Sequence, residues 1–373
     1  MENIAYKYRI YPTSEQQRFF AVNFGCCRFI YNQALNWRTL AYNADGTSLS
    51  YADTNLALTQ TKKFYPWLKD ADSASLQMAL RHLDRAFANF FDGRTDYPVF
   101  KKRNARQSYT TPMNGNSIKV TDKTITFPKL GAVSYRKHRK IHKGGVLKSA
   151  AISKDTDGRY YASLTYEYPE PIHAPFVDES KAIGLDMSME HFYMDSDGGT
   201  ADVPRYYRLM EARLAKEQAK LSMMTRGSNN YNKQKHRIAK LHAKIKHQRS
   251  DILHKLSYNL AMTYDVICIE DLNMKAMSQG LNLGKSVHDL GWGMFVSMLE
   301  YKCKRYGKVL VKVGRSYPSS KTCHKCGHVN KDLELSDRAY ICPECGNIID
   351  RDWQAALNIF DEGRRLYNSS MAA

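Results

Sequence analysis

Residues 323–358 read CHKCGHVNKDLELSDRAYICPECGNIIDRDWQAALN: two Cys-x-x-Cys pairs, each followed by glycine, and then an acidic helix start. Four thiolates on two tight turns form a tetrahedral site for Zn²⁺. Because cysteine fills all four positions, none remains for a catalytic water, and the zinc is expected to be structural. Four ordinary buried thiols are the alternative, but such paired spacing rarely arises by accident. The expected ligands of one zinc ion are Cys323, Cys326, Cys342 and Cys345.

The chain is long and strongly basic, with 373 residues, a formal charge of +19 and a pI of about 9.4. This length allows two or three domains with proper cores. A protein this basic usually meets a polyanion, most often nucleic acid. An anionic membrane surface is less favoured, since no basic amphipathic anchor, apolar signal segment or run of about 20 apolar residues is seen. Eight cysteines, four of them in a zinc pattern, suggest a reducing compartment, so we expect a cytoplasmic protein that does not contact membranes.

The N-terminal half alternates between strand and helix patterns. Residues 3–11 predict a strand, and Thr13 with Gln16 predicts a capping box that opens a helix, with an interruption at Gly25. Another helix is expected to begin near Asp72, and residues 146–168 predict a β-hairpin. We therefore expect a small β-barrel or sheet over residues 1–175, interrupted by a helical insertion over about 13–95.

Basic segments in this half are candidate phosphate contacts. Residues 97–110 interleave cations with aromatic residues, which could stack on bases or fill a core. The cluster at 136–140 is either a phosphate patch or a solvated loop. On the helix that begins near Asp72, the face with Gln77 and Arg81 is either solvated or in contact with nucleic acid.

The C-terminal half begins with an apolar strand at 181–187 that ends in an acid, and a second such strand spans 266–272. Between them, residues 204–263 predict a basic helical hairpin broken near 226–230, which is either a solvated arm or a nucleic-acid contact. A glycine-containing loop at 275–290, a helix at 292–307 and a strand at 309–313 lead to the cysteine pairs.

Three acids come from three separated elements of this half: Asp186, Glu270 and one of Asp350 and Asp352. An acid at the end of a buried strand is costly unless it is solvated, paired or bound to a metal. Carboxylates from two strands and the last helix of a mixed sheet hold two Mg²⁺ ions in ribonuclease-H-like nucleases. The alternative, that each acid only caps or solvates its element, is disfavoured for three acids together on a basic chain with a zinc ribbon.

The chain resembles the TnpB family, transposon-encoded RNA-guided nucleases related to type V CRISPR effectors. The most specific motifs are GLDMSM (184–189), IEDLNM (269–274), the two cysteine pairs and DRDWQAALN (350–358). YKYRIYPTSEQQ (6–17), GCCRFIYNQAL (25–35) and DYPVFKKR (96–103) resemble the family's N-terminal half.

The resemblance implies a fold and a site. A split RuvC nuclease domain of RNase H-like mixed α/β fold is expected at 176–373, with the zinc ribbon at 315–349 inserted in it. A wedge β-barrel with a helical recognition insertion is expected at 1–175. Asp186, Glu270 and Asp352 match the catalytic acids that hold two Mg²⁺ ions, and Asp350 is the substitute for the third. The chain departs from the family at Gln354, where asparagine is usual.

The resemblance also implies partners, a guide RNA derived from the transposon end and a double-stranded DNA target beside a short motif. The expected nucleic-acid contacts are Tyr51, Gln77, Arg81, Lys101, Lys102, Arg103 and Tyr109. Two alternatives stay open, a nuclease-inactive RNA-guided DNA-binding repressor and a DNA transposase of RNase H-like fold.

Overall fold

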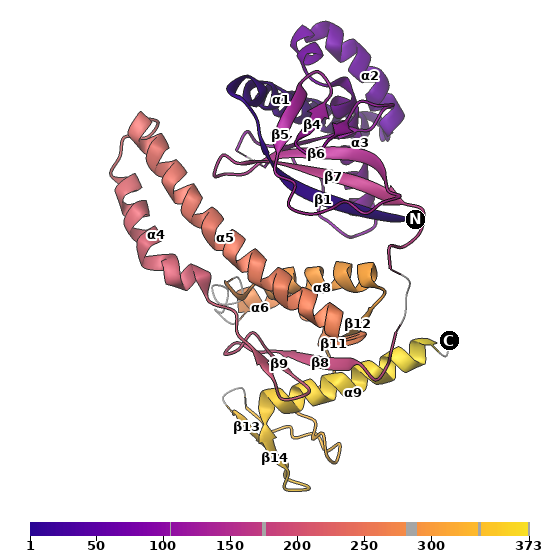
Figure 1. Ribbon diagram of the computed structural model, residues 1–373, viewed down its shortest axis with the longest axis vertical. Coiled ribbons are helices and arrows are strands. Elements are labelled where there is room, and N and C mark those ends of the chain that lie inside the picture. Colours follow the sequence, from indigo (N-terminus) through magenta and orange to yellow (C-terminus); the bar gives the residue numbers. More distant parts are fainter. Residues whose placement is uncertain (105, 174–176, 281–288, 335–336, 372–373) are drawn as a thin grey trace. The chain divides into compact units, whose positions relative to one another are not determined.

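The computed structural model describes residues 1–104, 106–173, 177–280, 289–334 and 337–371. The chain divides into two compact units, Met1–Glu170 and Pro171–Ala373. Each unit has its own sheet and helices, which Figure 1 labels, and each is described by itself.

The first unit contains a seven-stranded antiparallel sheet in the order β2-β6-β7-β1-β5-β4-β3. Along β1, alternate side chains such as Tyr6 and Tyr8 are buried, which is the period expected for one face of a sheet. β1 pairs with β7 from Glu2 to Ile10, and β6 and β7 form the predicted hairpin around the turn at 155–159. The strands are β1 (Glu2–Tyr11), β2 (Gln107–Pro112), β3 (Lys119–Val120), β4 (Thr124–Phe127), β5 (Gly131–Tyr135), β6 (Val146–Lys154) and β7 (Tyr160–Tyr168).

Helices fill the connection between β1 and β2: α1 (Ser14–Asp45), α2 (Tyr51–Phe64), the 3-10 helix η1 (Pro66–Asp70) and α3 (Ser73–Phe91). The capping box of Thr13 and Gln16 is confirmed. The predicted interruption at Gly25 is wrong: α1 continues through it, because one helical glycine costs only about 1 kcal/mol. Residue patterns did not predict α2, although Ser50 and Asp53 form a second capping box at its start.

The second unit is built on a five-stranded sheet in the order β10-β9-β8-β11-β12. β8, β11 and β12 run parallel, whereas β9 is antiparallel to β8 and β10. The strands are β8 (Ala182–Met187), β9 (Tyr193–Asp195), β10 (Thr200–Ala201), β11 (Val266–Glu270) and β12 (Val309–Val313). A separate hairpin, β13 (Ala339–Ile341) and β14 (Ile348–Asp350), carries the second cysteine pair in its turn.

Helices cover both faces of this sheet (Figure 1). α5 (Asn229–Thr263) and α8 (Trp292–Tyr306) pack on one face, where Ile183, Ile267 and Trp292 share one core. α9 (Arg351–Met371) packs on the other, where Val266 and Cys268 share a second core with Ile359 and Tyr367. β11 therefore alternates its side chains between the two cores.

The remaining helices lie between β10 and α8 in the chain. α4 (Tyr206–Ser222) and α5 form a helical hairpin around a turn at 223–228. The predicted loop at 275–290 is partly wrong, because α6 (Met274–Gly280) occupies its start; residues 281–288 lie outside the described residues. Across the described ranges, no helix is both long enough and apolar enough for a membrane span.

Candidate active site and zinc centre

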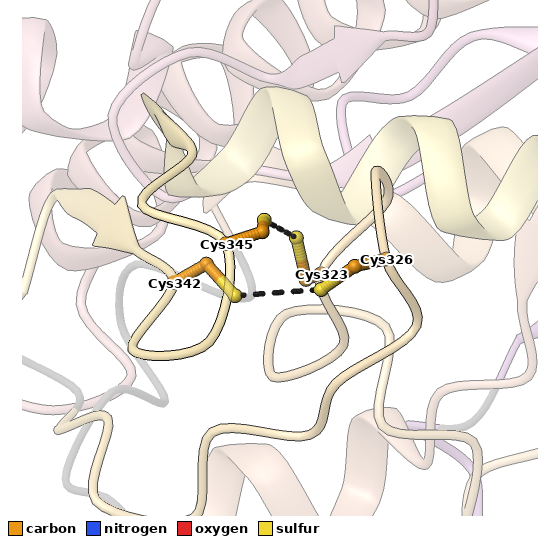
Figure 2. A group of neighbouring side chains, drawn as sticks. All are labelled: Cys323, Cys326, Cys342 and Cys345. Atoms are coloured by element: carbon orange, nitrogen blue, oxygen red, sulfur yellow. Dashed lines mark hydrogen bonds between the residues drawn. The ribbon is translucent and has the colours of Figure 1, made fainter.

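The four predicted cysteines come together at the ends of two turns (Figure 2). The Sγ atoms of Cys323 and Cys345 are 3.7 Å apart, and those of Cys326 and Cys342 are 3.6 Å apart. A tetrahedron with zinc–sulfur bonds of about 2.3 Å has sulfur–sulfur edges of about 3.8 Å. All four sulfurs lie within 4.8 Å of one another, so the donor set fits one Zn²⁺ ion in both chemistry and spacing.

One of these thiols is prepared to ionise. Burial raises the pKa of Cys342, but backbone N–H groups of Cys345 and Glu344 and the neighbouring thiols outweigh it and lower the pKa to about 6. Gly327 and Gly346 adopt positive φ angles of 76° and 69°, which glycine reaches without strain. These turns can therefore point their N–H groups toward the sulfurs.

The cysteine cluster is joined to α9 at three places. β14 ends at Asp350, and α9 begins at the next residue. The amide of Asn358 donates to the carbonyl oxygens of Ser319 and Thr322 over 2.7 and 2.6 Å. On the next turn of α9, Asp361 lies 3.2 Å from the Nδ1 atom of His324. The position of the zinc ribbon therefore depends on α9, and that of α9 on the ribbon.

Two of the predicted acids end neighbouring parallel strands. Leu185 of β8 is in register with Ile269 of β11, so Asp186 and Glu270 are the next pair along the two strands. Ile183, Leu185, Ile267 and Ile269 lie in the core below α5 and α8. By alternation, Asp186 and Glu270 point to the opposite face, which α9 covers.

The third acid is at the start of that helix. Asp352 is half-buried in the first turn of α9, and its carboxylate accepts a hydrogen bond of 3.0 Å from the hydroxyl of Ser188, just beyond β8. Gly184 explains why α9 comes so close to β8: a Cβ atom there would lie 2.4 Å from the carbonyl oxygen of Ala356. The structure thus brings Asp186, Glu270 and Asp352 to one edge of the sheet.

The acids influence each other electrostatically. Burial raises the pKa of Asp186 well above its usual range, and the charges of Glu270 and then Asp352 raise it further. Burial also raises the pKa of Glu270, while a hydrogen bond from the Ser319 hydroxyl to its Oε1 atom opposes that rise. Such uncompensated negative charge favours a bound cation, and carboxylate oxygens are the ligands that Mg²⁺ prefers.

Asp350 has a different task from Asp352. Its Oδ1 atom accepts hydrogen bonds of 2.9 Å from the backbone N–H groups of both Asp352 and Trp353. It therefore caps the N-terminus of α9, where four N–H groups have no partner within the helix. This favours Asp352 over Asp350 as the third member of the acidic group.

Among the residues that the structure describes, the cysteines are the group of three or more potential ligands whose donor atoms all lie within 4.8 Å. Gln354 lies two residues after Asp352 and is fully buried. Neither its amide nitrogen nor its oxygen has a hydrogen-bond partner in the described part of the chain, which is costly for a buried polar group.

The predicted contacts on the helical insertion lie together on α2 and α3. Arg81 of α3 stacks over the ring of Tyr51, the first residue of α2, at 5.0 Å. Gln77 is exposed one turn before Arg81, so the two share a face of α3. Gln77 and Arg81 are exposed and Tyr51 is half-buried, so the three residues form one polar surface.

The contacts predicted before and on β2 differ from one another. Lys102 lines a hollow of about 280 Å³ together with Lys101, Arg106 and Arg28, of which Arg28 lies outside the predicted basic segment 97–110. The ammonium of Lys101 lies 3.7 Å from the centre of the Tyr31 ring, and burial lowers its pKa. These cations come from α1 and from the segment before β2, so only the fold reveals that they share a hollow.

Two further predicted contacts on this segment have separate outcomes. Arg103 is exposed and lies outside this hollow, and its carbonyl accepts from Gln107 over 2.8 Å. Tyr109 is only 5% exposed and packs between Phe20 and Phe24. It fills the core and has no free ring face for a base, so the structure corrects its assignment as a nucleic-acid contact.

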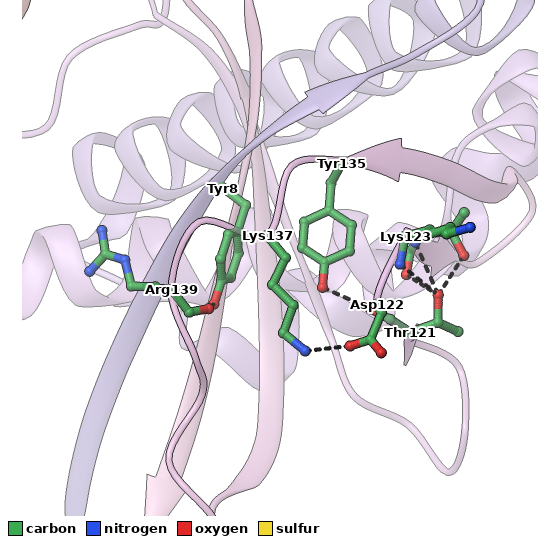
Figure 3. Close-up of polar contacts among 8 residues, drawn as sticks. Tyr8, Thr121, Asp122, Lys123, Tyr135, Lys137 and Arg139 are labelled. Atoms are coloured by element: carbon green, nitrogen blue, oxygen red, sulfur yellow. Dashed lines mark hydrogen bonds and ion pairs between the residues drawn. The ribbon is translucent and has the colours of Figure 1, made fainter.

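The basic cluster at 136–140 is partly engaged within the first unit (Figure 3). Lys137 forms an ion pair of 2.5 Å with Asp122, and this pair is exposed to solvent. The carbonyl of Arg139 accepts from the hydroxyl of Tyr8 over 3.2 Å, and the Nε atom of the Arg139 guanidinium donates to the Nε2 atom of His138 over 3.3 Å. Part of the cluster therefore neutralises a local acid.

The basic helical hairpin presents most of its cations to solvent. Its buried stripe, which includes Leu214 and Leu241, joins α4 to α5. The exposed cations of α5 include Lys233, Lys235, Arg237, Lys240, Lys244 and Lys246. Arg249, nearer the sheet, instead pairs with the buried Asp289 at 2.9 Å. The exposed face suits a polyanion.

Family profiles match three stretches of the chain. Residues 292–359 match the profile described as "Cas12f1-like, TNB domain", and residues 163–280 match "Probable transposase". Residues 1–47 match "Helix-turn-helix domain", although β1 and one continuous helix occupy residues 2–45 in the structure.

Two relatives match almost the whole chain. A "Putative RNA-guided DNA endonuclease" of Streptomyces pristinaespiralis is 36% identical over 362 residues, which cover 96% of this chain and 89% of the relative. "TnpB-like protein L770" of Acanthamoeba polyphaga mimivirus is 24% identical, with 96% of this chain and 72% of the relative covered. The chain belongs to the TnpB family.

This TnpB-family chain also resembles a solved structure, "Cryo-EM structure of the Cas12f1-sgRNA-target DNA complex". The superposition has a TM-score of 0.61 at 13% identity and covers 96% of this chain and 98% of the other. At this identity the likeness concerns the fold alone. The family membership predicted from the motifs is confirmed, and the mixed α/β architecture agrees with that of a Cas12 effector.

Proposed function

We propose that this TnpB-family protein is an RNA-guided DNA endonuclease whose catalytic acids are Asp186, Glu270 and Asp352. The observation that carries the proposal is their convergence at one sheet edge, where each of the other two raises the pKa of Asp186. The relative from Streptomyces pristinaespiralis, whose name contains this activity, supports it over nearly the full length.

The second unit is then a RuvC domain of RNase H-like fold. Its strand order β10-β9-β8-β11-β12, with two antiparallel pairs beside two parallel pairs, supports this assignment. The first unit is then the wedge domain, a β-barrel that carries α1 to α3 as its recognition insertion. The placement of α1 to α3 between β1 and β2, as an insertion in the strand sequence, supports this second assignment.

Each acid has its own place in the site. Asp186 and Glu270 extend from the ends of two paired strands, and Asp352 approaches from the helix above them. Two Mg²⁺ ions held by these carboxylates would activate a water and stabilise the leaving oxygen of the phosphodiester. Ser188 and Ser319 orient two of the carboxylates through hydrogen bonds. The four cysteines hold one structural Zn²⁺.

The nucleic acids are a guide RNA made from the transposon end and double-stranded DNA beside a short motif. The charge of +19, the exposed cations of α5 and the surface of Tyr51, Gln77 and Arg81 support this. The solved neighbour was determined with an sgRNA and a target DNA, which agrees with such partners. Base pairing with the guide would select the sequence, and the protein would read backbone and motif. Such a protein works in the prokaryotic cytosol, where its DNA lies.

Plasmid cleavage tests the proposal. Protein co-expressed with its transposon-end RNA is mixed with plasmids that carry a guide-matched target beside randomised flanks. Cleavage that requires the RNA, Mg²⁺ and Asp186, with Asp186→Ala as the comparison, is the expected result. Guided binding without cleavage would instead support a repressor. Absence of any RNA of defined sequence in the purified protein would return the transposase to first place.

A further inference from the structure

Ser319 connects the zinc ribbon to the acidic site. It lies in the turn at 317–322 just before the first cysteine, and it is buried, with 6% of its surface exposed. Its hydroxyl donates to the Oε1 atom of Glu270. Ser319 therefore lies in the turn that leads into the zinc ribbon and also contacts one of the acids.

Asn358 fixes this turn from the other side. It is 3% exposed, and its Nδ2 atom donates to the carbonyl oxygens of Ser319 and Thr322, over 2.7 and 2.6 Å. An amide nitrogen has two protons, so both donate to carbonyl oxygens of the turn. Within the turn, the hydroxyl and N–H of Thr322 both donate to the carbonyl of Pro318, over 2.9 and 3.0 Å.

These contacts form a continuous chain of hydrogen bonds from α9 to the end of β11. It begins at Asn358, passes through the backbone of Ser319 and ends on the carboxylate of Glu270. A carboxylate with one oxygen fixed by a neutral donor keeps its second oxygen for a metal.

We propose that Ser319 is a positioning residue for the divalent metal site: its hydroxyl orients Glu270, and Asn358 holds Ser319 in place from α9. This inference rests on the proposed nuclease function. It assigns to the ribbon turn a task that the zinc ligands alone do not perform, because the turn presents a donor to a catalytic acid.

Removal of an outer partner of a metal ligand typically reduces metal affinity about 10- to 100-fold. We therefore expect Ser319→Ala to weaken divalent metal binding about tenfold or more. Ser320→Ala, which changes the neighbouring, half-buried serine, is the matched control and should leave metal affinity as in the wild type.

The test is Mn²⁺ binding to the full-length, zinc-loaded protein, measured by electron paramagnetic resonance, with Glu270→Ala setting the background. Zinc content and thermal unfolding of each variant show whether the ribbon and the fold are intact. Mg²⁺ half-saturation of guided cleavage gives a second readout, and saturating Mg²⁺ should restore much of the activity of Ser319→Ala.

A double-mutant cycle tests the order of the chain. Because Asn358 acts on Glu270 through Ser319, Asn358→Ala should add little to the loss of Mn²⁺ affinity already caused by Ser319→Ala. Additive losses would overturn the relay, and wild-type Mn²⁺ affinity in a folded Ser319→Ala protein would overturn the role of Ser319. If the wild type neither binds Mn²⁺ nor cleaves DNA, the proposed function itself fails, which is a distinct outcome.

Discussion

The side-chain amide of Asn358 donates to the carbonyl oxygen of Thr322 over 2.6 Å. Thr322 directly precedes the first cysteine of the zinc ribbon, and Asn358 lies on the helix that begins beside Asp352. The ribbon is thus attached to this helix by a side-chain contact as well as by the chain itself. The placement of Asp352 consequently depends on the folding of the zinc site.

Loss of one zinc ligand should therefore affect the acidic site. For Cys326→Ser we expect loss of the bound zinc, a lower unfolding temperature and loss of cleavage, because the turn at 317–322 is no longer fixed. Elemental analysis and calorimetry measure the first two effects. As a control, wild-type protein stripped with a chelator should regain its unfolding temperature when zinc is returned. Full zinc occupancy in the variant would contradict the four-cysteine site.

Asp350 and Asp352 should differ sharply when replaced. Asp352→Ala should reduce cleavage by more than about a hundredfold, the upper range for loss of an outer-shell partner, because it removes a ligand itself. Asp350→Ala removes a helix cap and should lower stability by about 1 kcal/mol. Asp350→Asn keeps an acceptor for the two N–H groups and should leave both properties nearly unchanged. A greater loss of cleavage in Asp350→Asn than in Asp352→Ala would reverse the assignment.

Gly184 should be intolerant of even one added methyl group. The Cβ atom of Gly184→Ala would lie 2.4 Å from the carbonyl oxygen of Ala356 and 2.7 Å from the backbone nitrogen of Phe360. Overpacking of this kind typically costs about 1–3 kcal/mol. We expect a lower unfolding temperature and slower cleavage, since α9 must move away from β8. Gly314→Ala, where the added atom meets nothing within 4 Å, is the matched control and should behave as the wild type.

Lys302 should make stability depend on alkaline pH. It is 5% exposed and donates to the carbonyl of His254 and the hydroxyl of Ser257, and burial lowers its pKa to about 8. The pKa of lysine in the unfolded chain is about 10.4, so between pH 8 and pH 10.4 the unfolded state binds a proton that the folded state lacks. The free energy of unfolding is therefore highest above pH 10.4 and decreases as the pH falls to about 8.

Lys302→Met removes this dependence. Relative to the wild type, the variant should gain about 3 kcal/mol in unfolding free energy between pH 10.5 and pH 7. Denaturant unfolding at the two pH values measures the difference. Lys304→Met, at an exposed position two residues away, should show no such change. An equal change in both variants would mean that Lys302 is not buried as described.

Alanine variants of Arg81 and Tyr109 should show different defects, one in nucleic-acid binding and the other in stability. Arg81 is exposed, so Arg81→Ala should weaken target binding, most strongly at low salt, and leave stability unchanged. Tyr109 fills the core of the first unit, so Tyr109→Ala should lower stability by about 3–5 kcal/mol. Binding isotherms at several salt concentrations and thermal unfolding measure the two effects. Unchanged stability in Tyr109→Ala would restore it as a contact candidate.

Much of the second unit followed from residue patterns. The apolar runs at 181–187 and 266–272 predicted two strands, each ending in an acid. Two cysteine pairs of this spacing leave little choice of structure. These features are local in sequence, or repeat with the period of one element, and the structure describes them as expected.

The remaining features depend on contacts that no local pattern contains. Ser319 touches Glu270 across 49 residues, and nothing in its neighbourhood distinguishes it from Ser320. Tyr109 suits both a core and a base stack, because tyrosine is apolar with a polar tip. Gly25 interrupts a propensity pattern, but the packing of α1 overrides so small a preference.

The junction between β14 and α9 has no spacer, since one ends at Asp350 and the other begins at Arg351. A residue inserted there would turn the first turn of the helix by about 100° and shift it by about 1.5 Å. A hybrid protein could thus accept a longer or foreign loop between the two cysteine pairs. It could not accept an inserted or deleted residue at this boundary. The zinc site and the helix would still form, but the carboxylate of Asp352 would point away from the other two acids.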